Sequence, residues 1–259
     1  MQFEHLVVAR SDDTLRVQIN RPEKRNALSR AVLEEISAVF DHYANDETLR
    51  LAILSGAGDK SFAAGGDLRD LATVRSEAET HAMVQVARGA LDAIRRFPVP
   101  VVAALNGDAL GGGAELAVAC DCIVAAEHSR IGFIQGRLNI STAWGGGARL
   151  VGRVGPARAL RLLARSDLLD PAEALAIGLI DHVAVAGEPL DAAVATFTRP
   201  METQQPQVMR AFKALAQAGY AGADPAALAA IETSHFVATW LHDDHWAAAD
   251  KVLQARRSR

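Results

Sequence analysis

Residues 106–116 read NGDALGGGAEL, and this stretch decides both the fold class and the candidate site. An apolar strand at 99–105 runs straight into it, and a helix over about 112–120 follows. Glycines at such a corner let the backbone come close to a ligand, because no Cβ atom intervenes. The first N–H groups of the helix point outward with partial positive charge, so they can hold an oxyanion. Glu115 stands one turn away, where it can carry a proton.

The composition is typical of a soluble protein with a sizeable core. The chain has 259 residues, of which 50% are hydrophobic and 22% are charged, and its formal net charge is −4. The acidic balance and the lack of a long basic run argue against nucleic acid as the main partner. No apolar run reaches membrane-spanning length and no secretory leader is found, so we expect a cytoplasmic protein without membrane attachment. Cys120 and Cys122 are interpreted as reduced core residues.

Strands and helices alternate along most of the chain, which favours an α/β fold with largely buried sheets. Alternating and continuous apolar runs predict strands at residues 4–10, 15–19, 51–54, 99–105 and 122–126, the first two of which form a hairpin. Helical spacing predicts helices after the cap Ser29 and at residues 78–96, 112–120, 156–164, 171–177, 205–217 and 226–255. We therefore expect a core at 1–195 and a helical C-terminal region at 196–259.

A second glycine-rich corner, Ser61–Leu68, follows the strand 51–54 as the first corner follows the strand 99–105. If the two strands are neighbours, both corners lie at equivalent ends, and each can give one backbone N–H to the same carbonyl oxygen. Neither corner matches the glycine patterns of dinucleotide-binding or P-loop proteins. The residues alone thus predict an anion-binding corner with one nearby carboxylate.

Several ordered motifs carry a resemblance to a known superfamily. They are Asn20-Arg21-Pro22 with Asn26-Ala27-Leu28, then Phe62-Ala63-Ala64-Gly65-Gly66-Asp67-Leu68, and then Asn106-Gly107 with Gly111-Gly112-Gly113-Ala114-Glu115-Leu116 and Cys120-Asp121. In this order they resemble the crotonase superfamily, whose best-known members are the enoyl-CoA hydratases and isomerases. The resemblance covers roughly residues 12–183 of the chain.

The resemblance implies a crotonase-like spiral of ββα units, with a C-terminal helical region that builds homotrimers, often paired into hexamers. It implies an acyl-CoA substrate, with coenzyme A as part of that substrate and no metal or redox cofactor. The thioester carbonyl oxygen then sits between the backbone N–H groups of Gly66 and Gly112, and Glu115 is one of the family's two catalytic glutamates. Each preorganised donor can stabilise an enolate oxygen by ~3–4 kcal/mol.

Matching positions imply further substrate contacts. Arg25, beside Lys24, falls where the CoA phosphates or the adenine pass, and the backbone of Ala27 and Ala64 falls at the adenine. Solvated loop charges are the alternative for Arg25 and Lys24. The remaining implied substrate-binding residues are Asp67, Leu68, Leu110, Arg137, Thr142 and Trp144.

The sequence departs from the hydratase pattern at one catalytic position. The second glutamate of hydratases ends a segment resembling F-G-Q-P-E, which aligns on Phe133-Ile134-Gln135-Gly136-Arg137. A guanidinium is no general base at neutral pH, so the usual mechanism with two glutamates is in question. Arg137 either pairs with Glu115, or binds a substrate carboxylate, or is a surface arginine.

The segment that follows favours a different reaction within the superfamily. Residues 138–147 are shorter than the hydratase pattern requires, and their W-G-G…R-L ending resembles ethylmalonyl- and methylmalonyl-CoA decarboxylase-like members. Decarboxylation needs only an oxyanion hole and one acid, because the substrate loses its own carboxylate. Trp144 then lines the acyl pocket or is an ordinary buried aromatic residue. A non-catalytic acyl-CoA-binding protein is a third alternative, against which the retained Glu115 argues.

Overall fold

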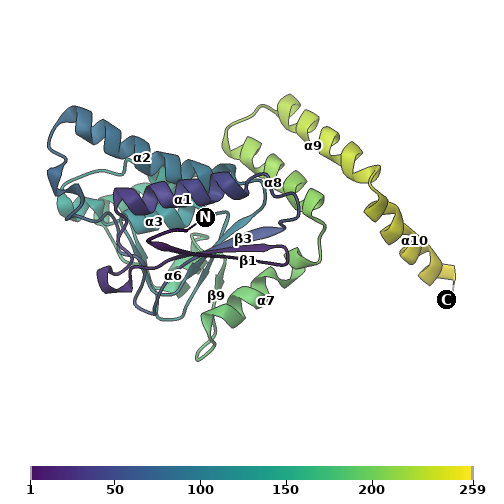
Figure 1. Ribbon diagram of the computed structural model, residues 1–259, viewed down its shortest axis with the longest axis horizontal. Helices are drawn as coiled ribbons and strands as arrows, with labels where there is room; N and C mark the ends of the chain where they lie inside the picture. Colours follow the sequence, from purple (N-terminus) through teal and green to yellow (C-terminus); the bar gives the residue numbers. More distant parts are fainter. Residues whose placement is uncertain (1, 258–259) are drawn as a thin grey trace.

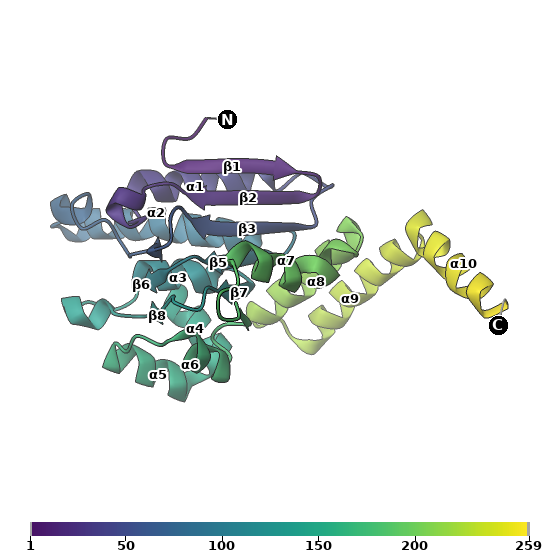
Figure 2. The same cartoon turned by 90° about the horizontal axis from the view of Figure 1, so that it is seen from below.

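A six-stranded sheet forms the centre of the molecule in the computed structural model, which describes residues 2–257 (Figure 1). In sheet order its strands are β1 (Leu6–Ser11), β2 (Thr14–Ile19), β3 (Leu51–Gly56), β5 (Val101–Leu105), β7 (Cys122–Ala125) and β9 (His182–Val183). Figure 2 shows β1, β2 and β3 side by side. β1 and β2 form the predicted antiparallel hairpin, and every other pair of neighbours is parallel. The expected α/β class is confirmed.

Helices cover both faces of this sheet at β3, β5 and β7, which are nearly continuous apolar runs, whereas β1 and β2 leave polar side chains exposed. Successive side chains of a strand point to opposite faces. Ala52 and Leu54 of β3 therefore join the main core, whereas Leu51 and Ile53 join a smaller core on the other face. The helices that cover the main core are α1 (Arg30–Tyr43) and α2 (Glu77–Arg96), and the smaller core lies under α7 (Leu190–Glu202).

A second sheet carries the two glycine-rich corners. It consists of the parallel strands β4 (Ser61–Ala63), β6 (Asp108–Leu110) and β8 (Ile131–Gly132). The sequence pattern predicts a loop at 61–63 and no strand at the other two places. Runs of two or three residues are too short to show the strand period, so these strands form only because they pair with one another.

Two asparagines join the sheets through the loop between β3 and β4. The fully buried Asn26 side chain donates to the Ser61 carbonyl (2.7 Å) and accepts from the Arg21 N–H (3.0 Å). Asn106 accepts from the Gly56 N–H (2.9 Å) and donates to the Ser61 carbonyl (3.1 Å). Side-chain amides thus satisfy backbone groups that the loop itself leaves unpaired, and they fix where the second sheet begins.

Helix α3 (Gly112–Ala119) is buried along its whole length, and it confirms the helix predicted at 112–120. Helices α4 and α7 are not among the predicted ones. Helix α4 begins at Gly146 and Gly147, and glycine is a poor helix former, so local propensity does not reveal it. The remaining elements of the body are η1 (Pro22–Lys24), η2 (Leu71–Thr73), η3 (Gln135–Leu138), α4 (Gly146–Val154), α5 (Pro156–Arg165) and α6 (Pro171–Ala176).

Helix α8 (Pro206–Tyr220) packs on the body through its buried residues Met209 and Lys213. The last two helices, α9 (Pro225–Trp240) and α10 (Asp243–Arg257), form an arm that extends away from the body (Figure 1). The single helix predicted at 226–255 is wrong, because the chain turns at Leu241 and His242 and the His242 ring accepts from the Asp244 N–H (3.3 Å) at the start of α10. The predicted boundary after residue 195 lies inside α7. In the described part of the chain, no helix is long and apolar enough to cross a lipid bilayer.

A buried ion pair fixes α8 to the body. Lys213 is 3% exposed, and its ammonium group contacts the Asp121 carboxylate, which also accepts from the Val101 N–H at 2.8 Å. Arg153 donates to the Asp121 carbonyl (3.2 Å) and to the Asp181 carboxylate (2.6 Å). These charges lie where α8 meets the edge of the main sheet, so they hold α8 in place.

Replacing one member of this pair will destabilise the protein. Lys213→Met leaves the Asp121 carboxylate, which is 18% exposed, without its ammonium partner, and we expect a loss of up to about 3 kcal/mol in the free energy of unfolding. Denaturant titration followed by circular dichroism measures this loss. The control is Arg165→Ala, whose ion pair with Asp167 is exposed and for which we expect a far smaller change. Equal effects of the two substitutions would contradict the prediction.

Candidate active site

The two glycine-rich corners meet in space. β3 and β5 are parallel neighbours, as the sequence analysis requires, and the corners beyond them touch. A Cβ atom built on Gly65 would lie 3.0 Å from the Leu110 carbonyl oxygen and 3.7 Å from the Gly112 nitrogen. The N-terminal motif joins them through Leu28, whose N–H donates to the Gly65 carbonyl (2.8 Å) and whose carbonyl accepts from the Asp67 N–H (2.9 Å). Three segments distant in sequence therefore converge at one place.

The corners present two backbone amides, those of Gly66 and Gly112. Within residues 2–257, neither amide donates a hydrogen bond to a protein acceptor. Gly112 is the first residue of α3, so the helix leaves its N–H free and adds partial positive charge there. Gly111 precedes it with a φ of +54°, which a residue with a side chain rarely adopts. The backbone thus supplies two free donors for one anion.

Glu115 lies one turn further along α3 and is 2% exposed. One of its carboxylate oxygens accepts from the backbone N–H groups of Trp144 (3.2 Å) and Gly146 (3.1 Å), and the other accepts from the Gln135 side chain (2.9 Å). Burial raises the pKa of Glu115, and these donors, with the charge of Arg88, offset part of the rise. A carboxyl group with a raised pKa is suited to carry a proton.

Gln135 belongs to this site, although the sequence analysis does not select it. It begins η3 and is 9% exposed. Its amide nitrogen donates to Glu115, whereas its Oε1 has no hydrogen-bond partner among the described residues. Buried polar atoms are normally paired, so this oxygen is an acceptor available to a ligand or to water. The signal that could have found it is its place in the segment resembling F-G-Q-P-E.

Arg137 points away from Glu115, so the predicted pairing between them is wrong. The Arg137 side chain is exposed, and its Nη2 donates to the Ser166 carbonyl at 2.6 Å. In a 3₁₀ turn, residues two apart lie about a third of a turn from each other, so Gln135 and Arg137 face different sides. Arg137 is therefore a surface arginine, which is one of the three alternatives given in the sequence analysis. A contact between Arg137 and a substrate carboxylate stays a prediction.

Trp144 packs its indole against both corners and is 7% exposed. A Cβ atom on Gly112 would lie 2.3 Å from Trp144 Cζ3, and one on Gly66 would lie 3.4 Å from Trp144 Cη2. Its backbone N–H also holds the Glu115 carboxylate. Trp144 therefore borders both the free amides and the carboxyl group, which is the position predicted for a residue of the acyl pocket.

Three other residues predicted to bind substrate lie elsewhere or have structural partners. Asp67 forms a buried ion pair with Arg21 (2.9 Å); burial alone raises the Asp67 pKa, but the bond from Arg21 and two backbone N–H groups bring it below its ordinary value. Leu68 is 62% exposed. Thr142 Oγ1 would lie 2.3 Å from a Cβ atom on Gly147, at the start of α4. Substrate contacts of these residues stay predictions.

A cavity of about 560 Å³ opens beside the corners. Three of the predicted substrate-binding residues line it, namely Arg25, Ala64 and Leu110. Ala27 is not in this lining, and its carbonyl accepts from Arg21 Nη1 at 2.5 Å. Arg25 and Ala64 are two of the residues that the resemblance implies for coenzyme A, and their contact with it stays a prediction.

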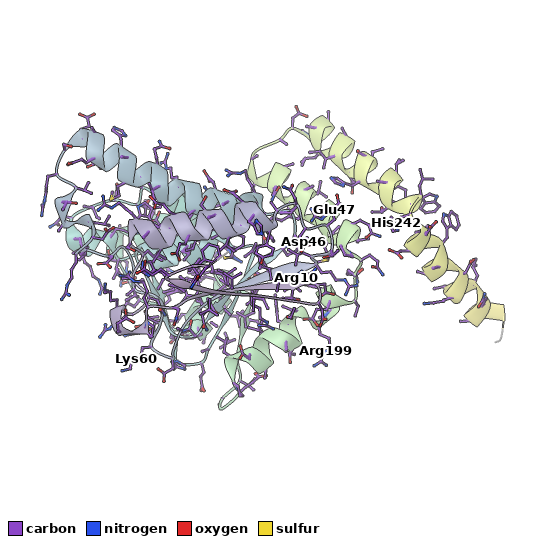
Figure 3. All side chains as sticks on the ribbon, in the orientation of Figure 1. Arg10, Asp46, Glu47, Lys60, Arg199 and His242 are labelled. Atoms are coloured by element: carbon purple, nitrogen blue, oxygen red, sulfur yellow. The ribbon has the colours of Figure 1, made fainter. Side chains whose placement is uncertain are left out.

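Charged residues that the sequence analysis did not select also line this cavity; they are Asp59, Lys60, Asp108, His128 and Arg130. Arg25 and Lys60 form no ion pair with any described residue, whereas Arg130 is paired with Asp108. Lys60 lies on the far side of the body from His242 and the arm (Figure 3). These residues come from separate loops, so no spacing in the sequence marks them.

The α/β fold holds two free backbone amides beside a buried glutamate. This arrangement is typical of enzymes that stabilise an anionic intermediate, and it defines the class of protein. The family model for enoyl-CoA hydratase/isomerase proteins matches residues 10–253. The chain belongs to this family and has the crotonase fold.

Individual relatives agree with this assignment. Crotonyl-CoA hydratase of Syntrophomonas wolfei is 36% identical over 183 residues, which cover 71% of this chain and 70% of that protein. Mitochondrial methylglutaconyl-CoA hydratase of Mus musculus is 37% identical over 198 residues, which cover 75% of this chain but only 63% of the mouse protein. The structure of an enoyl-CoA hydratase from Bacillus anthracis superposes with a TM-score of 0.90 at 28% identity, over 97% of each chain.

We expect Glu115→Gln to change the pH dependence of stability. The pKa of Glu115 is raised in the fold, so the folded protein holds this proton more tightly than the unfolded chain does. Relative to the variant, wild type therefore loses stability as pH rises from the ordinary glutamate pKa through the raised one. The measurement is the free energy of unfolding in denaturant from about pH 3 to about pH 8, a range that includes the window below the ordinary glutamate pKa.

Glu79→Gln is the matched control, because it should show the opposite trend. The pKa of Glu79 is lowered by backbone N–H groups of Arg75 and Ser76 in the capping box of α2. The stability that Glu79 contributes is therefore present above its ordinary pKa and lost as pH falls through the lowered one. A stability difference for Glu115→Gln that does not vary with pH would contradict the prediction.

Proposed function

We propose that this chain catalyses a reaction of the enoyl-CoA hydratase/isomerase type on an acyl-CoA thioester, through an enolate stabilised by two backbone amides. The observation that carries the proposal is the convergence of the free amides of Gly66 and Gly112 with the buried Glu115. The names of the relatives support an acyl-CoA substrate, because two of them are hydratases of crotonyl-CoA and methylglutaconyl-CoA. Such chemistry uses no metal or redox group, and coenzyme A is part of the substrate.

The proposed mechanism places the thioester carbonyl oxygen on the two amides. Negative charge develops on this oxygen when the enolate forms, and each preorganised donor lowers the barrier by about 3 kcal/mol. Glu115 moves the proton at the α-carbon, and its raised pKa suits it to hold a proton at one step and release it at another. Gln135 and the N–H groups that bond the carboxyl group fix its orientation.

Decarboxylation of an alkylmalonyl-CoA is the second candidate. Among the described residues, no other carboxylate contacts Glu115, and Arg137 in the place of the second glutamate is exposed. In decarboxylation the bond from the α-carbon to the carboxylate breaks, carbon dioxide leaves and the electron pair forms the enolate. Glu115 then donates one proton to the α-carbon. A single carboxyl group suffices for this sequence, whereas hydration is usually assigned two.

The α9–α10 arm is proposed to be an oligomerisation region that packs on other copies of the chain, as the family resemblance implies for homotrimers or hexamers. Helix α9 has no buried residue in the single chain. Large apolar side chains are exposed along the arm, namely Phe236, Val237, Trp240, Leu241 and Trp246. An exposed apolar surface of this kind is typical of a subunit interface.

Turnover of two substrates separates the candidates. Crotonyl-CoA and ethylmalonyl-CoA are offered separately to wild type, to Glu115→Gln and, as a matched control, to Glu173→Gln in the capping box of α6. We expect Glu115→Gln to lower kcat about 10²–10⁴-fold with acyl-CoA binding retained, because the proton carrier is lost. The control should keep wild-type turnover.

The substrate that turns over decides between the reactions. Rapid hydration of crotonyl-CoA that is lost in Glu115→Gln would refute the decarboxylase candidate. Release of carbon dioxide from ethylmalonyl-CoA without hydration of crotonyl-CoA would refute the hydratase. Binding of several acyl-CoAs without turnover, equal in wild type and Glu115→Ala, would instead indicate a non-catalytic acyl-CoA-binding protein.

Trp240→Asp should reduce the mass of the protein in solution to that of a monomer. The added charge would be buried in the proposed interface, which is costly without a partner charge. Light scattering during gel filtration measures the mass of wild type and variant. Leu160→Asp is the control, because Leu160 is 68% exposed on α5 in the body. A monomeric wild type, or an unchanged mass for Trp240→Asp, would refute this role of the arm.

A further inference from the structure

The six-membered ring of the Trp144 indole forms a wall common to both glycine corners. A Cβ atom on Gly112 would lie 2.3 Å from Cζ3, 2.8 Å from Cη2 and 3.0 Å from Cε3 of this ring. A Cβ atom on Gly66 would lie 3.4 Å from Cη2 and 3.6 Å from Cζ2. The same Gly66 position is closed from a second direction by Leu71, whose Cδ1 would be 2.9 Å away. The space beside the two amides is therefore narrow and apolar.

Trp144 also holds the Glu115 carboxyl group through its backbone. The Trp144 N–H donates to Glu115 at 3.2 Å, so the backbone of the residue that borders the amides also positions the carboxyl group. A thioester with its carbonyl oxygen on Gly66 and Gly112 must place its α-carbon within reach of Glu115. The Trp144 ring borders both amides, so it is a wall that the carbon atoms beyond the α-carbon would meet.

The open cavity of the site does not extend to Trp144. The cavity of about 560 Å³ is lined by Arg25, Ala64 and Leu110, and neither Trp144 nor Glu115 belongs to its lining. Trp144 is instead 7% exposed and is part of the main hydrophobic core. The open cavity thus offers room for the large coenzyme A portion, whereas the surroundings of Trp144 are packed.

We propose that Trp144 is the residue that limits the substrate to short acyl groups. The inference rests on the proposed function, since it assumes that the thioester carbonyl binds at the two amides. Each methylene beyond the limit meets the indole ring, and a packed core resists such overpacking. A tryptophan that only filled the core would affect stability without changing the preferred chain length.

The test is the binding of saturated acyl-CoAs, which have no double bond to hydrate and no second carboxylate to lose. Isothermal titration calorimetry gives Kd for acetyl-, butyryl-, hexanoyl- and octanoyl-CoA with wild type, Trp144→Ala and the milder Trp144→Phe. Wild type should bind octanoyl-CoA at least about tenfold more weakly than butyryl-CoA. Trp144→Ala should reverse this order and gain about fourfold per added methylene, because the longer chain fills the vacated space.

Leu160→Ala is the control, because it removes a large apolar side chain that is 68% exposed on α5, outside both the site and the proposed interface. It should keep the wild-type order of affinities. Equal affinity of wild type for butyryl- and octanoyl-CoA would overturn the inference, and this comparison needs no variant. A chain-length order left unchanged by folded Trp144→Phe and Trp144→Ala would also overturn it. If wild type binds no acyl-CoA of any length, the proposed function fails, and the inference fails with it.

Discussion

The close approach of α3 to its neighbours is the constraint on which the site depends. A Cβ atom on Gly113 would lie 1.9 Å from the Ala63 carbonyl oxygen, and one on Gly146 would lie 2.4 Å from Glu115 Cβ. A side chain at either position would push α3 away from β4 or from α4. The free amide at the start of α3 would then leave the other corner, and the carboxyl group would lose its backbone donors. The chemistry therefore rests on backbone contacts that only glycine allows.

The environment of Glu115 balances two opposing effects. Burial disfavours the charged carboxylate, whereas the hydrogen bonds from Gln135, Trp144 and Gly146 favour it. The net result is a raised pKa in a group whose orientation is fixed. A proton carrier needs both properties, because it must exchange its proton and hold its position towards the reacting carbon. The free oxygen of Gln135 is a further acceptor close to this group.

Long periodic segments made most of the fold predictable. The helix after Ser29 forms with the predicted cap, in which the serine side chain accepts from the Val32 N–H at 3.4 Å. The strands of the main sheet other than β9 are long enough to show their apolar pattern, whereas β9, β4, β6 and β8 are not. For the site, the glycine-rich corners predicted an anion-binding place with Glu115 nearby, and the family resemblance selected Gly66 and Gly112 within them. The charges that line the cavity could not be predicted, because isolated loop residues carry no periodic signal.

By itself, the sequence determined the α/β class, the two glycine-rich corners and the family resemblance. Apolar periodicity and the need for glycine at a tight corner are local properties, and local properties are visible in a sequence. The tertiary structure alone decided that Gln135 and not Arg137 faces Glu115, and that Trp144 borders both corners. These outcomes depend on how a short turn is rotated against the core and on contacts between residues far apart in the chain, which no local pattern encodes.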